Sequence, residues 1–158
     1  MEFFTIGVYN SSEEEFFNKL IDNNIDTFCD IRKRRGVRGA KYAFVNSKRL
    51  QSRLKELNIR YEHILELAPT SEIRELQKEA DAKNNELKRH RKKLGKIFTI
   101  AYKDKILNKF DFNSLIKKLE NIGAKRVVFF CVEEHPEACH RSIVTDKLKT
   151  FGYKITHL

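Results

Sequence analysis

Short runs of strand-forming residues alternate with helix-patterned segments from one end of the chain to the other. The first run spans residues 3–8, and the second spans residues 25–31. Between them, Ser11 and Ser12 can cap a helix whose first turn carries glutamates, which the helix dipole favours there. A strand, a helix and a strand within about 30 residues is typical of a βαβ unit, whose two strands are parallel. The pattern therefore indicates the α/β class of folds.

The same alternation continues to the C-terminus. Periodicity and end signals predict helices over residues 46–57, 71–94, 97–107, 111–121 and 138–150, and strands over residues 59–65, 126–132 and 153–158. The highly charged helix over 71–94 is expected to end at Gly95 and to lie on the outside. Residues 97–107 also fit a strand, and helix is the preferred interpretation. The sequence thus predicts a single three-layer α/β domain over residues 1–158, with a mostly parallel sheet of about five strands and flanking helices.

The composition agrees with a globular domain. A chain of 158 residues fits one domain, and no run of about 18 apolar residues occurs, so we expect no membrane span. The first residues, MEFFTIGVYN, lack the cationic start of a signal peptide. Three cysteines make an odd count, which favours free thiols over a disulfide framework. These features favour a reducing, cytoplasmic location.

The chain carries a net charge of +10, and two segments hold much of it. One is the glycine-containing loop over residues 32–41, and the other is residues 88–96, expected near the end of the long helix. Clusters of this kind attract nucleic acid, although a solvated surface is the preferred interpretation of the second cluster. The candidate nucleic-acid contacts of the loop are Arg34, Arg35, Arg38 and Lys41.

Polar stretches follow three of the expected strands, at the point where each strand ends. They are Tyr9-Asn10-Ser11, Asp30-Ile31-Arg32, and Cys131-Val132-Glu133 with the helix start Cys139-His140-Arg141. In an open parallel sheet, ligands bind at the carboxyl ends of the strands, so we expect these stretches to meet in one site. Asp30 can hold the guanidinium of Arg32 ready for an anionic ligand, or the two can form a simple structural ion pair. Both alternatives stay open.

With these motifs the chain resembles the bacterial and archaeal family catalogued as domain of unknown function 488. The resemblance runs from residue 3 to the end of the chain. It rests on Thr5-Ile6-Gly7, Asp30-Ile31-Arg32, Leu67-Ala68-Pro69-Thr70 and, most specifically, the Cys-x-Glu and Cys-His-Arg motifs of residues 131–141. Many members carry proline and serine in the loop after the Asp-x-Arg motif, where this chain has the basic residues 33–39. The resemblance implies a fold and a site, and no reaction.

Residues 131–141, CVEEHPEACHR, admit a metal site or a catalytic thiol. Zinc is disfavoured because Cys131 and Cys139 lack the paired spacing of zinc ligands and because Cys139 and His140 are expected to point apart. We therefore expect no bound metal and no cofactor. A catalytic thiol would be Cys139, since a helix N-terminus beside an arginine stabilises a thiolate, but buried free cysteines are common without such a role.

The preferred interpretation of the same stretch is an anion site. The first N–H groups of the following helix have no partners within it, and the helix dipole favours negative charge there. The predicted ligand-binding residues are Asp30, Arg32, Arg141, Ser142, Asn10 and Ser11, with His140 as a further donor. The alternative is internal: a glutamate of the loop caps the helix and pairs with Arg141.

The function expected from these features is the binding of a phosphate-bearing ligand, a nucleotide or a nucleic acid, at the carboxyl edge of the sheet. If the protein is a hydrolase or transferase, Glu133 is the first candidate for the acid or base and His140 the second, because such reactions need a titratable group near the phosphate. One alternative is a non-enzymatic nucleic-acid-binding module that uses the basic loop and the basic helix. Another is a structural partner protein with a basic surface.

Overall fold

The computed structural model describes residues 1–158, apart from the side chain of Arg89. Over that range it contains a five-stranded sheet and six α-helices. The strands are β1 (Glu2–Ile6), β2 (Thr27–Asp30), β3 (Arg60–His63), β4 (Arg126–Phe130) and β5 (Ile155–His157). The helices are α1 (Glu13–Asp22), α2 (Ser47–Glu56), α3 (Ser71–Lys83), α4 (Lys96–Tyr102), α5 (Phe112–Asn121) and α6 (His140–Lys149). In the part of the chain that the structure describes, no helix has the length and apolar character needed to cross a membrane.

The sheet has the strand order β3-β2-β4-β1-β5, and every pair of neighbours is parallel. This confirms the predicted α/β class. Strand β4 lies in the middle and pairs with both β1 and β2, so its side chains are covered on both faces. Full coverage explains why it is a continuous apolar run rather than an alternating one.

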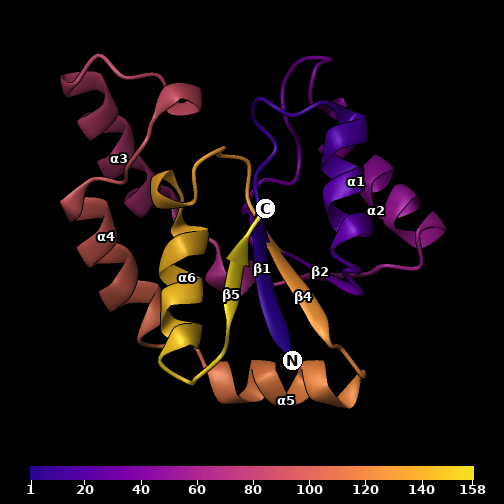
Figure 1. Cartoon of the computed structure of the whole chain (residues 1–158). Coiled ribbons are helices and arrows are strands. Elements are labelled where there is room, and N and C mark those ends of the chain that lie inside the picture. The colour runs from indigo at the N-terminus through magenta and orange to yellow at the C-terminus, as the bar shows by residue number, and fades with distance from the viewer.

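Helices cover both faces of the sheet and make two separate cores (Figure 1). On one face, Phe16 of α1 and Leu50 of α2 pack against Phe28 and Phe130 of the sheet. On the other face, α3, α4, α5 and α6 pack against alternate residues of the same strands, such as Phe129. This arrangement gives three layers, because successive side chains of a strand point to opposite faces.

The long helix predicted over residues 71–94 is wrong. Helix α3 ends at Lys83, and Asn85 has a positive φ of 51°, which turns the chain away from the helix axis. A single 3-10 turn, Lys88–His90, then leads to Gly95, which lies at the start of α4 instead of at the end of a helix. The basic residues 88–96 are therefore mostly on a loop. Asparagine tolerates left-handed backbone conformations better than most residues, which accounts for the break.

Residues 97–107, which also fit a strand in the sequence, are helical as predicted. Helix α4 covers Lys96–Tyr102 and continues directly into a wider π-type turn, Lys103–Leu107. Each predicted strand is shorter in the structure than in the sequence-based prediction, by one residue for β1 (Glu2–Ile6 against residues 3–8) and by two or three residues for the other four. Most of the polar residues at the carboxyl ends of the strands therefore lie in loops.

The carboxyl ends of β1, β2 and β4 lie side by side at one edge of the sheet, which we call the carboxyl edge (Figure 1). From there, β1 and β2 lead to α1 and α2 on one face, whereas β4 leads to α6 on the opposite face. Neighbouring strands whose connections depart in opposite directions leave a crevice between their loops, where α/β proteins commonly bind ligands. The fold therefore brings the three polar stretches together as expected.

Candidate functional site at the carboxyl edge

The first polar pair, Asp30 and Arg32, forms a buried two-point ion pair. Arg32 Nε donates to Asp30 Oδ1 at 2.9 Å and Nη2 donates to Oδ2 at 2.8 Å. Nη2 also donates to the carbonyl oxygen of Val45, and the guanidinium lies over the ring of Phe130, 4.5 Å from its centroid. With only 4% of Arg32 exposed, this geometry supports the structural alternative, in which the pair ties the end of β2 to its neighbours.

Arg141 holds the loop after β4 through backbone contacts. Its two terminal nitrogens donate to the carbonyl oxygens of Glu133 and Glu134 at 2.6 Å and 2.7 Å, and 1% of the residue is exposed. It therefore neither pairs with a loop carboxylate nor faces solvent: its two terminal nitrogens are engaged by the protein, and its Nε is buried without a hydrogen-bond partner. Gly7 makes this packing feasible, because a Cβ atom there would lie 2.0 Å from the Glu133 carbonyl oxygen.

Glu133 is held as a charged carboxylate by three neighbours. Its Oε1 accepts from Arg91 Nη2 at 3.2 Å and pairs with Lys88 Nζ at 3.4 Å, while Oε2 accepts from the Cys131 thiol at 3.1 Å. Burial raises the pKa of Glu133, but Lys88, the Cys131 thiol and Arg91 together lower the pKa to about 2. A group with that pKa is a poor proton donor or acceptor near neutral pH, so its contacts favour a fixed negative charge over acid–base work.

Two thiols and an imidazole lie together beneath this carboxylate. The Sγ atoms of Cys131 and Cys139 and a ring nitrogen of His140 all lie within 4.8 Å of one another. His140 Nε2 is 3.1 Å from the carbonyl oxygen of Ile31, which joins this cluster to the end of β2. A hydrogen bond with Cys139, together with burial, raises the pKa of the Cys131 thiol well above its ordinary value. Cys131 is therefore a neutral thiol at neutral pH.

Five predicted site residues, Asp30, Arg32, Glu133, His140 and Arg141, do converge around the ends of β2 and β4. All five are buried, however, so they pack among themselves and against the backbone instead of lining an open pocket. The hydroxyl of Ser142 donates to the carbonyl oxygen of Cys139 within the first turn of α6. The backbone N–H of Ser11 donates to the carbonyl oxygen of Val8.

Open cationic surface remains on the loop that follows β2. Arg34, Arg38 and Lys41 are exposed, and Arg35 is half-buried beside Tyr61. The second basic segment contributes exposed Lys88, Lys92 and Lys93. Among the ion pairs of the described side chains, Arg34, Arg38, Lys41, Lys92 and Lys93 take no part.

A continuous series of contacts connects the two basic segments across the carboxyl edge. The hydroxyl of Tyr42, at the end of the basic loop, accepts from the backbone N–H of Asn10. The side chain of Asn10 in turn donates to the carboxylate of Glu134, next to the Glu133 that binds Lys88 and Arg91. Asn10 has a positive φ of 61°, which turns the chain after β1 toward both partners. The two basic segments therefore belong to one surface.

Aromatic side chains lie between these basic segments. The rings of Tyr9 and Tyr42 are 5.3 Å apart, and Lys41 Nζ lies 5.2 Å from the centroid of Tyr42. Burial raises the pKa of Tyr9. The charge of Lys88 lowers this pKa and that of Glu133 raises it, so the Tyr9 side chain lies close to both charged groups. Both tyrosines are half-buried and thus expose part of their surface at the edge.

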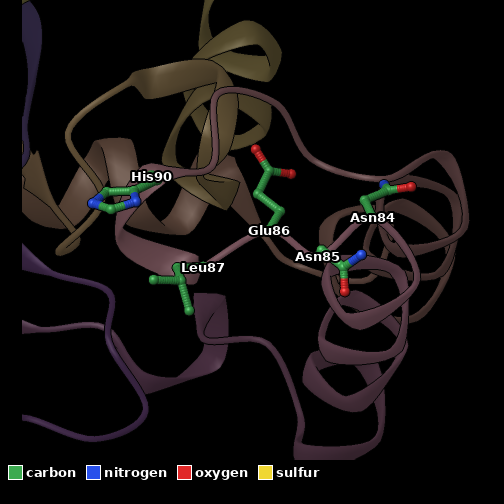
Figure 2. Close-up of a pocket in the computed structure, with 5 residues that line it drawn as sticks. All are labelled: Asn84, Asn85, Glu86, Leu87 and His90. Atoms are coloured by element: carbon green, nitrogen blue, oxygen red, sulfur yellow. The ribbon is translucent and has the colours of Figure 1, made fainter.

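Two pockets lie apart from the predicted site residues. Figure 2 shows the first, about 490 Å³, lined by Asn84, Asn85, Glu86, Leu87 and His90 of the segment that follows α3. Leu87 and His90 lie toward one end of it and the two asparagines toward the other (Figure 2). The second, about 540 Å³, lies between the end of β3, the Lys103–Leu107 turn and α5. Neither of these two pockets is lined by a predicted site residue.

Sequence reasoning missed several members of this network. Asp81 of α3 pairs with Arg91 at 2.7 Å, and Arg91 also donates to the carbonyl oxygen of Ala138. Arg91 was expected on the exposed face of a helix, and no periodic signal distinguishes it from its lysine neighbours. The aromatic pair could have been found, because Tyr9 belongs to the first polar stretch and Tyr42 directly follows the basic loop over residues 32–41.

The spacing and side-chain directions that disfavoured a zinc site in the sequence do not hold in the fold. Cys139 Sγ and His140 Nδ1 are 3.6 Å apart, although adjacent residues at a helix start were expected to point in different directions. The loop between Cys131 and Cys139 folds back, so the wide sequence spacing does not separate the thiols.

Comparison with known proteins gives a family and no function. A family model described as "Domain of unknown function DUF488" matches residues 12–148, which is most of the chain. No curated protein and no solved structure matches the chain significantly.

Proposed function

The chain belongs to the DUF488 family, and we propose that it binds nucleic acid through the phosphate backbone, at the carboxyl edge of its sheet. The observation that carries the proposal is the set of exposed cationic side chains without ion-pair partners, contributed by two segments of one surface: Arg34, Arg38, Lys41, Lys92 and Lys93. Unpaired cations gathered on one side of a protein attract a polyanion and release its counterions on binding.

The aromatic pair supports a single-stranded ligand in particular. Proteins that bind single strands combine a basic track for the backbone with aromatic rings on which bases stack. Tyr9 and Tyr42 lie between the two basic segments and expose part of their rings. A nucleotide would use the same features with fewer contacts, so we expect a polymer to bind more tightly than a mononucleotide.

The proposal assigns no reaction. Glu133 is engaged by Lys88, Arg91 and Cys131, and Cys139 is only 1% exposed. A general base must reach a proton of the substrate, and a nucleophile must reach its target atom. These contacts favour the non-enzymatic binding module over a hydrolase or transferase.

The test is a titration of labelled single- and double-stranded oligonucleotides at several salt concentrations. Changing Arg34, Arg38 and Lys41 together to alanine removes three phosphate contacts, so the slope of log affinity against log salt should become less steep by about 2–3. The matched control changes Lys55, Lys125 and Lys154, which are exposed near the opposite edge of the sheet, and it removes the same charge.

We expect the control triple variant to keep a slope close to that of the unaltered protein. An equal decrease of the salt slope in the two triple variants would mean that binding depends on net charge alone and does not take place at the carboxyl edge. An absence of binding by the unaltered protein at low salt would refute the proposed function.

A further inference from the structure

We propose that Cys131, Cys139 and His140 hold a zinc ion, with the carboxylate of Glu133 as the fourth ligand. The three donor atoms already lie within 4.8 Å of one another, in a region where all three residues are buried. In a tetrahedral site with Zn–S bonds of about 2.3 Å and Zn–N bonds of about 2.0–2.1 Å, the sulfur and nitrogen are about 3.6 Å apart. Cys139 Sγ and His140 Nδ1 have that separation, 3.6 Å.

The orientation of the imidazole supports the same conclusion. His140 Nε2 lies 3.1 Å from the carbonyl oxygen of Ile31, which can only accept a hydrogen bond, so Nε2 carries the proton. The other nitrogen, Nδ1, then directs its lone pair at the thiol of Cys139. Metal-binding histidines are held in this way, with the outer nitrogen donating to a carbonyl or carboxylate.

Glu133 completes the ligand set and the charge balance. Its Oε2 lies 3.1 Å from Cys131 Sγ, so an oxygen donor already adjoins one of the two thiols, while Oε1 is occupied by Lys88 and Arg91. When the ion binds, the two thiols release their protons to solvent. Two thiolates and a carboxylate then bring three negative charges to a divalent ion, and the two cationic side chains offset the excess. Thiolate and imidazole donors select zinc over magnesium or calcium.

Such an ion would fasten the loop after β4 to the start of α6 and, through His140, to the end of β2. It would stabilise the folded state without reaching solvent, which fits a structural site better than a catalytic one. The inference stands apart from the proposed function, because it uses the buried cluster and not the exposed cations.

The first test uses unaltered, untagged protein kept under reducing conditions. Elemental analysis after incubation with zinc and removal of free metal should give a stoichiometric amount of zinc. Replacement by Co²⁺ should give the intense visible bands of a tetrahedral ion and a thiolate-to-metal charge-transfer band in the near ultraviolet. Zinc should also raise the thermal unfolding midpoint and protect two of the three thiols from alkylation.

The second test compares cysteine variants. Replacing a residue that only contacts a metal ligand typically weakens metal binding by roughly 10–100-fold. Cys139→Ala removes a ligand itself, so it should weaken zinc binding by more than that. The control is Cys29→Ala, because Cys29 is also a buried thiol but lies in the core on the other face of the sheet.

Several outcomes would overturn the zinc site: substoichiometric metal in the reduced, unaltered protein, a cobalt spectrum without thiolate charge transfer, or equal losses of affinity in the two cysteine variants. The cobalt spectrum needs no variant, so the inference can be refuted even if Cys139→Ala fails to fold. A negative result would leave the proposed nucleic-acid binding unaffected.

Discussion

At the scale of single residues, Gly7 and Arg141 determine how closely the loops after β1 and β4 approach. The backbone N–H groups of Val8 and Tyr9 both donate to the carbonyl oxygen of Val132, so the two loops are in direct backbone contact. Arg141 then fixes the next two carbonyl groups of the second loop. The buried part of the carboxyl edge is therefore held by backbone and guanidinium hydrogen bonds, and its exposed part carries cationic side chains.

Gly7→Ala should destabilise the protein strongly. The new Cβ would meet the Glu133 carbonyl oxygen at 2.0 Å and Arg141 Nη2 at 3.2 Å, and backbone atoms in a packed interior cannot move aside easily. We expect a loss of about 3 kcal/mol in the free energy of unfolding, measured with urea. Gly36→Ala is the control, because its Cβ would meet only Asn46 Oδ1 at 3.9 Å. Equal stability of the two variants would contradict the close approach.

His157 should make stability depend on pH. Burial, followed by the charges of Lys149 and Arg141, lowers the pKa of His157, and its Nδ1 lies 2.7 Å from the hydroxyl oxygen of Thr5. The unfolded chain therefore takes up the proton first as pH falls, so the contribution of His157 to stability is present above the ordinary histidine pKa and is lost below it.

The measurement is urea unfolding of the unaltered protein and of His157→Gln at about pH 7.5 and about pH 5.5, on either side of the ordinary histidine pKa. The unaltered protein should lose more stability between these pH values than the variant does. Identical losses would mean that His157 titrates as it does in the unfolded chain.

At the scale of elements, the segment after α3 is anchored by Arg91. Its guanidinium connects Asp81 of α3 with Glu133 and with the carbonyl oxygen of Ala138. Gln77 of the same helix donates to Asp81 and accepts from the backbone N–H of Gly95. Gln77, Asp81 and Arg91 therefore form a buried hydrogen-bonded group that connects α3 with the loop after it, where a continuous helix was predicted.

Asp81→Asn should weaken this anchor. Arg91 would keep its contact with Glu133 but lose a charged partner in a buried place, so we expect a loss of about 2 kcal/mol in the free energy of unfolding. Glu75→Gln is the control, because its ion pair with Lys78 is exposed to solvent and should contribute much less to stability than the buried pair. Urea unfolding of both variants decides the matter, and equal losses would show that the Arg91 anchor adds no stability.

Helix and strand types could be predicted where one physical signal dominates. Phe16, Phe17 and Leu20 recur at helical spacing after the Ser12 cap, which the structure shows as a complete capping box. The end of α3 could not be predicted, because Asn84-Asn85 is a weaker stop than glycine or proline and the charged pattern continues past it. The burial of Asp81 and Arg91 depends on the ion pair between them, and the periodicity of the sequence does not predict such a tertiary contact.

At the scale of the whole molecule, the location of the candidate site followed from topology alone. Parallel strands end at the same edge, so polar stretches after β1, β2 and β4 had to meet. The direction of each side chain could not be predicted. Arg32 and Arg141 turn inward because buried carboxylate and carbonyl oxygens need donors, whereas Arg34 and Arg38 stay exposed.

The central claim is that nucleic acid binds at the carboxyl edge. The most direct measurement is amide chemical-shift mapping of the unaltered protein as a single-stranded oligonucleotide is added. We predict that the shifts gather in residues 9–12, 33–42 and 88–94, and that residues 124–126 and 153–155 at the opposite edge stay unchanged. Shifts centred on the opposite edge or on α5, or no shifts at low salt, would contradict the account.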